Sequence, residues 1–388
     1  MKKNFKVIVI GLGGLGSAAA YWLSRRLGSD VLGLEQFEIG HLNGGSQDHS
    51  RIIRLSYHNE NYVELAKLAY DAWDELEQDA EEKLIVKTGG IDLSPANALI
   101  PLSDYTESMT ACGVPYEMLD AKEAMYRWPQ WKLTDDIQVL YQEESGIAPA
   151  AKAMAAHLRM ARAHGAVLKD NVPVTGITPI GDEVEVTAGG ETYRCEQLVI
   201  ASGAWSNTAL GYLGEGVNLT VTKEQVVYYD TPNVADFMPD RFPIWIWMTE
   251  PCFYGFPVYG ENGPKASQDA GGQETTADTR TFEPDLPMLE RINNFVKQYL
   301  PAAYGPPILT KTCLYAMPPD RDFVIAKLPD QPNIQVGIGA GHAFKYSSQI
   351  GRMLSELALD GTTPHDISPF SYTRPILFEE NPEKSFMV

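Results

Sequence analysis

The distribution of apolar and polar positions first predicts an α/β unit at the start of the chain. Residues 6–10 form a β-branched apolar run, which is typical of a strand buried on both faces of a parallel sheet. A glycine turn follows, and residues 17–27 predict a helix whose small side chains allow close packing on that sheet. Residues 31–34 predict a second strand. Strand, turn, helix and strand in this order indicate a parallel βαβ arrangement.

The same pattern returns in later parts of the chain. Residues 150–164 predict a helix, residues 197–205 a buried strand that ends in a glycine turn, and residues 334–360 a final strand and helix. Residues 86–149 and 216–309 differ, because short apolar runs alternate there with Pro, Gly and aromatic residues. The second of these segments contains a polar stretch, 261–281, that predicts a loop. We therefore expect a second domain that is inserted into the first.

The turn after the first strand carries a dinucleotide-binding motif. It reads Gly-Leu-Gly-Gly-Leu-Gly, with the motif glycines at Gly11, Gly13 and Gly16, and Glu35 ends the second predicted strand. Glycines allow close approach of a pyrophosphate, the helix start offers unpaired N–H groups, and a carboxylate accepts from ribose hydroxyls. The motif alone does not distinguish NAD from FAD.

Composition narrows the classes of partner. The chain has 31 Lys and Arg against 51 Asp and Glu, a formal charge of −20, which repels nucleic acids and anionic lipid surfaces. An anionic substrate would therefore need cations gathered in a pocket. The cysteines are widely spaced, without a C-x-x-C pair, so the sequence favours neither a disulfide scaffold nor a metal site.

The first apolar run superficially resembles a secretory signal, because Lys2 and Lys3 precede it. Its repeated glycines and the second apolar run after Arg25 and Arg26 favour a strand, turn and helix instead. No other apolar segment approaches the ~20 residues of a membrane span. We expect a cytoplasmic protein without a membrane partner.

Several stretches together resemble the monomeric sarcosine oxidase and N-methyltryptophan oxidase family of flavoenzymes. They are the amino-terminal unit, R-I-I-R from Arg51, the strand at 198–205, T-C-L-Y from Thr312 with the following D-R-D-F-V-I, and the closing G-A-G-H-A-F-K-Y-S-S. The stretches occur in the order of that family and cover nearly the whole chain. The resemblance implies bound FAD and favours a monomer.

The resemblance also implies which residues hold the flavin. Cys313 matches the cysteine that carries FAD through a covalent thioether, whereas burial statistics alone would make it a small core residue. Arg51 matches a residue placed against the flavin. The other implied cofactor contacts, besides the motif glycines and Glu35, are Ser46, Gly341, Phe344 and Lys345.

On the substrate side, the resemblance implies a carboxylate clamp made by Arg54 and Lys345. Lys265 matches a lysine that promotes the reaction of reduced flavin with oxygen, although a solvated loop lysine is the simpler interpretation. Tyr254 matches an active-site tyrosine. Trp245 stands where sarcosine oxidases have a smaller residue, so it is a candidate for substrate binding or for the domain core.

Two departures from the family pattern concern the substrate. Asp269 and Gln47 occupy positions where the family often has histidine, and His49 is displaced by two residues. These differences put sarcosine itself in doubt. An aromatic pocket suits a bulkier or cyclic amino acid better.

The expected reaction is oxidation of a C–N bond in an amino acid, at a secondary amine, giving an imine and then hydrogen peroxide from dioxygen. Cations such as Arg51, Lys265 and Lys345 would favour the neutral, reactive amine and stabilise reduced flavin, and no dedicated catalytic base is apparent. A flavin dehydrogenase using a quinone or protein acceptor, an NAD-dependent dehydrogenase and a non-catalytic FAD-binding subunit remain alternatives.

The fold class expected is α/β, with α+β character in the second domain. A discontinuous, Rossmann-like FAD-binding domain would comprise residues 1–85, 150–215 and 310–388. A sheet-based substrate-binding domain would comprise residues 86–149 and 216–309.

Overall fold

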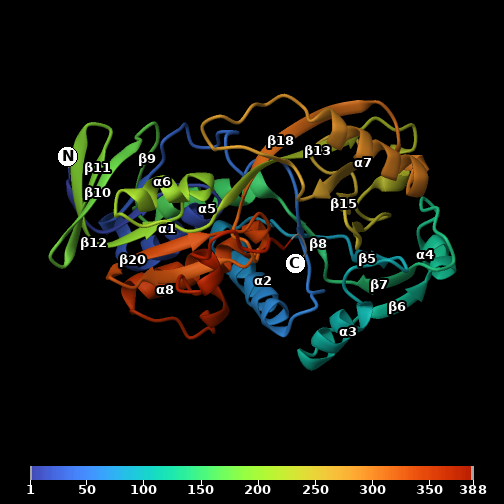
Figure 1. Cartoon of the computed structure of the whole chain (residues 1–388), viewed down its shortest axis with the longest axis horizontal. Helices are drawn as coiled ribbons and strands as arrows, with labels where there is room; N and C mark the ends of the chain where they lie inside the picture. Colours follow the sequence, from blue (N-terminus) through green and yellow to red (C-terminus); the bar gives the residue numbers. More distant parts are fainter. Residues whose placement is uncertain (1, 386–388) are drawn as a thin grey trace.

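Two large β-sheets organise the chain in the computed structural model, which describes residues 2–385 (Figure 1). The first sheet lies at the end of the molecule that holds α1, α8 and the amino terminus (Figure 1). The second lies towards the opposite end, where α4 and α7 are found. The α/β character and the separate second sheet confirm the expected fold class.

Within residues 2–385 the first sheet has eight strands in the order β10-β11-β12-β1-β2-β9, with β20 on β12 and β19 on β20. The strands around the glycine turn are parallel, as the apolar pattern predicts. The bounds are β1 Asn4–Ile10, β2 Val31–Leu34, β9 Val167–Lys169, β10 Val174–Ile180, β11 Glu183–Ala188, β12 Glu191–Ile200, β19 Val324–Leu328 and β20 Gln331–Ile338.

Helices cover this sheet and bury its apolar face. Helix α1 packs against both α5 and α8, and α2 also packs against these two helices. The small residues of α1 allow this contact, since an added Cβ at Gly351 of α8 would lie 2.5 Å from the Ala18 Cβ. The bounds are α1 Gly14–Leu27, α2 Glu60–Ala80, α5 Ala150–Ala163, α6 Ser206–Gly211 and α8 Ser347–Leu359.

The second sheet has nine strands in residues 2–385, in the order β17-β13-β16-β15-β14-β5-β7-β6, with β18 paired to β13. The domain boundary expected at residue 310 falls inside β18, which hydrogen-bonds along β13 and therefore belongs to this sheet. The bounds are β5 Gly90–Ser94, β6 Glu117–Asp120, β7 Gln138–Gln142, β13 Thr220–Tyr229, β14 Ile244–Trp247, β15 Cys252–Phe256, β16 Lys265–Asp269, β17 Gln273–Glu274 and β18 Pro307–Met317.

The segment 261–281, expected to be a loop, contains β16 and β17. The sequence of β16 is polar, so it lacks the apolar alternation that predicts a strand. It is nevertheless buried, because it pairs with β13 on one side and β15 on the other. The first half of the segment is therefore a buried polar strand, whereas residues 271–281 are exposed or half-buried and, apart from β17, form the expected loop.

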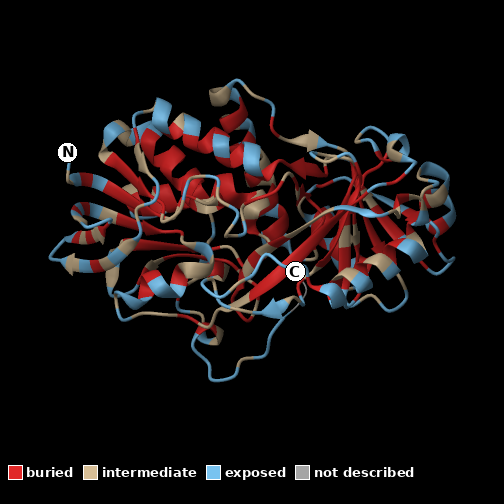
Figure 2. Ribbon diagram, turned by 90° about the horizontal axis from the view of Figure 1, so that it is seen from above, coloured by how far each residue is buried: buried red, intermediate tan, exposed pale blue. Residues whose placement is uncertain are grey.

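One face of the second sheet packs on α7, and aromatic side chains from both form a core. In Figure 2 buried residues fill the interior of the molecule, and exposed residues lie mainly on its periphery. Smaller elements complete the chain: a sheet of β3, β8 and β4 joins the two halves, and α3 and α4 flank the second sheet. No helix within residues 2–385 is long and apolar enough to cross a bilayer. The bounds are β3 Arg51–Ile53, β4 Val86–Lys87, β8 Gly146–Ala148, α3 Leu102–Ala111, α4 Ala121–Arg127 and α7 Leu286–Tyr299.

Candidate active site

The glycine turn between β1 and α1 adopts a geometry that only glycine permits at two positions. Gly11 has φ of 85°, and an added Cβ there would lie 2.7 Å from the Ala201 carbonyl oxygen. An added Cβ at Gly16 would lie 1.8 Å from the Gly11 carbonyl oxygen. Gly13 is the N-cap of α1 and gives it no side-chain cap, so the positive end of the helix faces the turn.

Glu35 lies at the end of β2 and braces this turn. Its carboxylate accepts the backbone N–H of Leu12 at 2.9 Å and that of Phe37 at 3.2 Å. Burial alone would raise the pKa of Glu35, but hydrogen bonds from His41 and from these two N–H groups hold that pKa below its ordinary value. A charged carboxylate is thus available at the position expected for a ribose contact.

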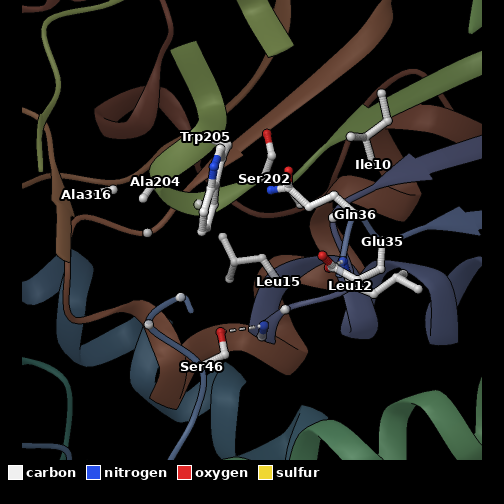
Figure 3. Close-up of a pocket in the computed structure, with 18 of the residues that line it drawn as sticks. Ile10, Leu12, Leu15, Glu35, Gln36, Ser46, Ser202, Ala204, Trp205 and Ala316 are labelled. Carbon is white, nitrogen blue, oxygen red and sulfur yellow. Dashed lines mark hydrogen bonds between the residues drawn. The ribbon is translucent and has the colours of Figure 1, made fainter. Parts of the chain in front are cut away.

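The larger of the two main cavities opens over this turn (Figure 3). Ser46 reaches it from a distant loop, and its Oγ accepts the Gly14 N–H at 2.8 Å. On the other side, Gly341 has φ of 81°, and an added Cβ would lie 2.6 Å from the Tyr315 ring. A glycine cradle, an open helix start and a buried carboxylate suit a dinucleotide. The lining includes the predicted cofactor contacts Gly11, Gly13, Glu35, Ser46, Arg51, Gly341 and Phe344.

A second cavity adjoins the first and shares a wall with it. The shared residues are Arg51, Tyr315, Gly341 and Phe344. The predicted substrate-side residues Arg54, Tyr254 and Lys345 line the second cavity. A ligand in the second cavity would therefore adjoin one end of a nucleotide in the first.

The cations of the second cavity are not equivalent. Arg54 donates to the Asp92 carboxylate at 2.7 Å, and both side chains are buried. Burial opposes the charge on Arg54, but Asp92 raises its pKa above the ordinary value. The Arg54 charge is therefore already compensated by Asp92, and the part of Arg54 in a two-cation clamp stays a prediction.

Lys345 lies in the turn before α8, partly buried, with its Nζ 5.6 Å from the centre of the Tyr57 ring. Among residues 2–385 no carboxylate lies within ion-pair distance of its Nζ. Burial lowers the pKa of Lys345, and the nearby Arg54 charge acts in the same direction. Of the two predicted clamp residues, Lys345 is the one available to an anion.

Strand register decides which side chains of the second sheet reach the cavities. Residues directly opposite each other in paired strands share a face. Tyr254 lies opposite Ile246 and Ser267, and it faces the second cavity. Trp245 lies one residue from Ile246, so it points to the other face, where it stacks on Phe295 of α7 at 5.5 Å. The expectation that Trp245 binds substrate is therefore wrong.

Cys313 lies on β18 directly opposite Glu224 of β13. Its chain neighbours Leu314 and Tyr315 line the larger cavity. Burial raises the pKa of the Cys313 thiol to about 11, although the Arg51 charge opposes this. Glu224 is buried with one carboxylate oxygen unpartnered, and burial raises its pKa to about 7.

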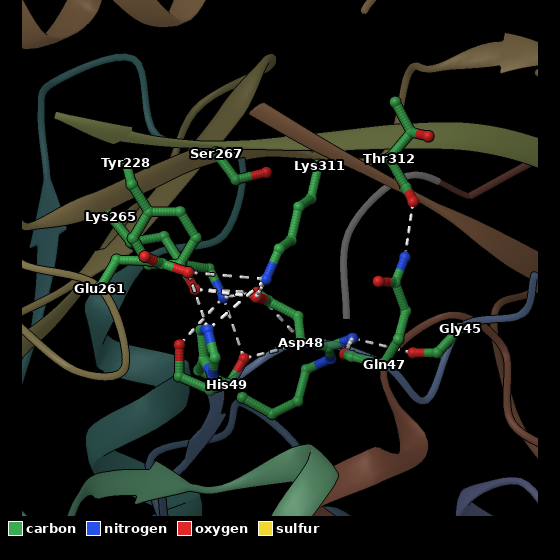
Figure 4. A network of polar contacts seen from close by, with 12 residues as sticks. Gly45, Gln47, Asp48, His49, Tyr228, Glu261, Lys265, Ser267, Lys311 and Thr312 are labelled. Atoms are coloured by element: carbon green, nitrogen blue, oxygen red, sulfur yellow. Dashed lines mark hydrogen bonds and ion pairs between the residues drawn. The ribbon is translucent and has the colours of Figure 1, made fainter. Parts of the chain in front are cut away.

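Lys265 is almost fully buried on β16 and is held by polar contacts (Figure 4). Its Nζ donates to the Asp48 carboxylate at 2.8 Å and to the Ser50 carbonyl and hydroxyl oxygens at 3.0 and 2.9 Å. Arg51 donates to backbone carbonyls of the same loop, including Gln47 at 2.6 Å. The loop before β3 thus gathers both predicted cations.

Sequence reasoning missed two anions and one further cation of this region. Asp48, Asp92 and the buried Arg321 were not identified, although Asp48 and Arg321 stand within or beside stretches that carried the family resemblance. Asp269, noted as a departure from the family, pairs with Arg321 at 3.1 Å, and both line the second cavity. Acidic and basic residues stand close together in these stretches, as in Asp320-Arg321-Asp322, and this pattern could have indicated buried ion pairs.

Comparison with known proteins assigns the whole arrangement to one family. The sequence profile described as FAD dependent oxidoreductase matches residues 6–357. The chain is 36% identical over 383 residues to the monomeric sarcosine oxidase of Streptomyces avermitilis, covering 96% of this chain and 98% of that protein. It is 29% identical over 378 residues to the N-methyl-L-tryptophan oxidase of Yersinia pestis, covering 96% of this chain and 99% of that protein.

Among solved structures, NikD, an unusual amino acid oxidase essential for nikkomycin biosynthesis, matches in its open form with a TM-score of 0.84. Its sequence is 26% identical, and the match covers 95% of this chain and 98% of that chain. The agreement extends over both sheets of the molecule.

Proposed function

Because this chain belongs to the FAD dependent oxidoreductase family, we propose that it oxidises the C–N bond of an amino acid at a secondary amine, either N-methyl or cyclic. The product is an imine, and dioxygen is the final electron acceptor, giving hydrogen peroxide. One observation carries this proposal: a cavity lined by Lys345 and aromatic rings shares a wall with the nucleotide cavity.

The residues of the larger cavity fit FAD, which supplies the two-electron acceptor that amine oxidation requires. The turn from Gly11 to Gly14 and the start of α1 would receive the pyrophosphate, and Glu35 the ribose. Arg51 and Phe344 belong to the wall between the cavities, where they would contact the reactive end of the cofactor.

The second cavity binds and orients the substrate. Lys345 would pair with the substrate carboxylate, and Arg54 would join it only by sharing its bond to Asp92. Aromatic side chains such as Tyr57 and Tyr254 form the walls, which exclude water and suit a ring or a bulky side chain. The surrounding cations favour the neutral, reactive form of the amine by lowering its pKa.

We further propose that Cys313 holds the flavin covalently. Its place on β18, beside the residues that line the nucleotide cavity, supports this assignment. The flavin of the wild type should stay with the chain after acid precipitation, and Cys313→Ser should release it. Flavin that washes out of denatured wild type would disprove the link and leave the dinucleotide site intact.

Lys265 is the residue proposed to promote the reaction with oxygen. A fixed, buried cation stabilises the negative charge that develops when oxygen is reduced. Lys265→Met should slow reoxidation of the reduced enzyme far more than its reduction by substrate, in stopped-flow measurements of the two half-reactions. Equal slowing of both would indicate damage to the site in general.

The decisive experiment for the reaction class is an anaerobic screen of the purified flavoprotein. Bleaching of the flavin by N-methyl and cyclic amino acids, but not by primary ones, supports oxidation of a secondary amine. Reoxidation of the bleached enzyme in air distinguishes an oxidase from a dehydrogenase with another acceptor. A protein that no amine bleaches would be a flavin-binding subunit without this activity.

A further inference from the structure

Asp48, which has no role in the proposed reaction, is the centre of a buried charge cluster (Figure 4). Its side chain is 4% exposed, and its two oxygens contact donors from three different strands. These are Lys265 at 2.8 Å, Lys311 at 3.1 Å and the Tyr228 hydroxyl at 2.9 and 3.0 Å. The Arg51 guanidinium lies 4.0 Å away.

The backbone at Asp48 is held in an unusual conformation. Its φ of 81° lies in the left-handed region, which side chains other than glycine, asparagine and aspartate rarely adopt. The loop around it is fixed on both sides, because the Ala151 N–H donates to the Asp48 carbonyl oxygen and Lys265 donates to Ser50. The loop therefore directs this carboxylate towards Lys265 at some cost in backbone strain.

Lys265 depends on such a counter-ion. Its other contacts are uncharged: the Ser50 oxygens at 3.0 and 2.9 Å and the ring faces of Phe256 and Tyr228 at 4.5 and 5.6 Å. The Arg51 charge disfavours the ammonium form. Burial lowers the pKa of Lys265 to about 8, and Arg51 acts in the same direction, whereas Asp48 opposes both. Although burial would raise the pKa of Asp48, the charges of Lys265, Arg51 and Lys311 hold it well below its ordinary value.

We infer that Asp48 is a positioning residue that keeps Lys265 protonated and fixed in place, and that it thereby sets the pH range in which the enzyme reacts with oxygen. The second part rests on the proposed role of Lys265. Asp48 faces Lys265 on β16, Tyr228 on β13, Lys311 on β18 and Arg51 on β3, so among these groups it is the sole negative charge in direct contact with the lysine. Without it, Lys265 would lose its proton at a lower pH.

Asp48→Asn is a suitable variant, because asparagine has the same shape and tolerates the left-handed conformation. Selective ¹³C labelling of lysine allows the Lys265 amine to be titrated by NMR in the FAD-bound protein, with Lys265→Met identifying its resonance. The midpoint should lie near 8 in the wild type and at least about one pH unit lower in Asp48→Asn, the ordinary effect of losing an adjacent opposite charge.

Glu261→Gln is the matched control. Glu261 belongs to the outer part of the same cluster, where it contacts His49 at 2.9 Å and Lys311 at 3.9 Å. The substitution removes one negative charge that does not contact Lys265, so the titration midpoint of Lys265 should stay close to the wild-type value. Thermal midpoint and flavin content of each variant verify that the fold is retained.

The kinetic consequence is measured separately. Reoxidation of the reduced enzyme should slow as the pH rises through about 8 in the wild type, and through a correspondingly lower pH in Asp48→Asn. At about pH 7.5 the variant should be at least about threefold slower, whereas its reduction by substrate changes little. In a Lys265→Met background, Asp48→Asn should have no further effect on reoxidation.

An unchanged NMR midpoint in Asp48→Asn would overturn the inference. A shifted midpoint with an unchanged pH profile of reoxidation would uphold the control of Lys265 by Asp48 and refute the proposed role of Lys265 with oxygen.

Discussion

The two cavities of this protein are built by different means. The nucleotide cavity is built around the turn between β1 and α1, whose backbone N–H groups and helix end supply polar contacts, and Glu35 adds a buried carboxylate. The second cavity gathers charged side chains from segments far apart in the chain, and Arg54 and Arg321 there each pair with a carboxylate. Backbone geometry defines the first site, and the balance of buried charges defines the second.

This difference predicts how substitutions in each cavity should affect the protein. A defect in the turn should act through steric conflict and abolish the site. A defect in the second cavity should act through an uncompensated charge and should depend on pH and on the charge of the ligand.

Gly16→Ala should give the largest effect. The added Cβ would meet the Gly11 carbonyl oxygen at 1.8 Å, so β1, the turn and α1 cannot keep their packing. We expect little folded, flavin-containing protein, measured by the ratio of flavin to protein absorbance and by the thermal midpoint. Gly211→Ala is the control, because nothing lies within 4 Å of its added Cβ. Normal flavin content in Gly16→Ala would contradict the backbone-defined site.

Glu224→Gln examines the buried charges of the second sheet. The folded pKa of Glu224, about 7, lies above the ordinary value of about 4.5, so the folded state holds the proton more tightly and stability is lost as the pH rises from about 4.5 to 7. Glutamine avoids this loss. The variant should gain up to about 3 kcal/mol over wild type at pH 8 and little at pH 4.5, measured by denaturant unfolding at both values. A gain in stability that is the same at both pH values would show that ionisation of Glu224 does not cause the loss of stability.

Lys345→Met examines the carboxylate site. It should weaken the apparent affinity for amino-acid substrates by about 1.5–3 kcal/mol, or roughly 10- to 150-fold, because one charge-assisted hydrogen bond is lost. Esters or amides of the same substrates should be affected little. Arg54→Ala is a poorer test, because it leaves Asp92 buried without its partner and should also lower stability. If the wild type oxidises neutral analogues as well as acids, no carboxylate site exists.

Trp245→Phe should have the smallest effect on catalysis. The side chain is 1% exposed and packs between Trp131 and Phe295 on the face away from the cavities. We expect a loss of stability of about 1–2 kcal/mol and a KM within about twofold of wild type. Tyr254→Phe, on the opposite face, should raise KM without a matching loss of stability. A large change in KM in Trp245→Phe would indicate that Trp245 contacts the substrate after all.

Local apolar patterns and short motifs are enough to specify part of this fold and site. Residues 6–35 specify a parallel strand, turn and helix, since the apolar periods and the glycines at Gly11 and Gly16 agree on one conformation. The family resemblance placed Arg54, Tyr254 and Lys345 on the substrate side, and these residues line one cavity.

The pairing of buried charges and the face that each strand turns to the cavity depend on how distant segments pack together. Asp48 meets Lys265 across 217 positions of sequence, and Asp92 meets Arg54 across 38. Trp245 and Ile246 are adjacent in sequence, yet the alternation of a strand sends them to opposite faces, and the pairing of β14 with β15 fixes which one meets the cavity. Long-range electrostatics and strand register depend on contacts between distant segments, so no local pattern of residues specifies them.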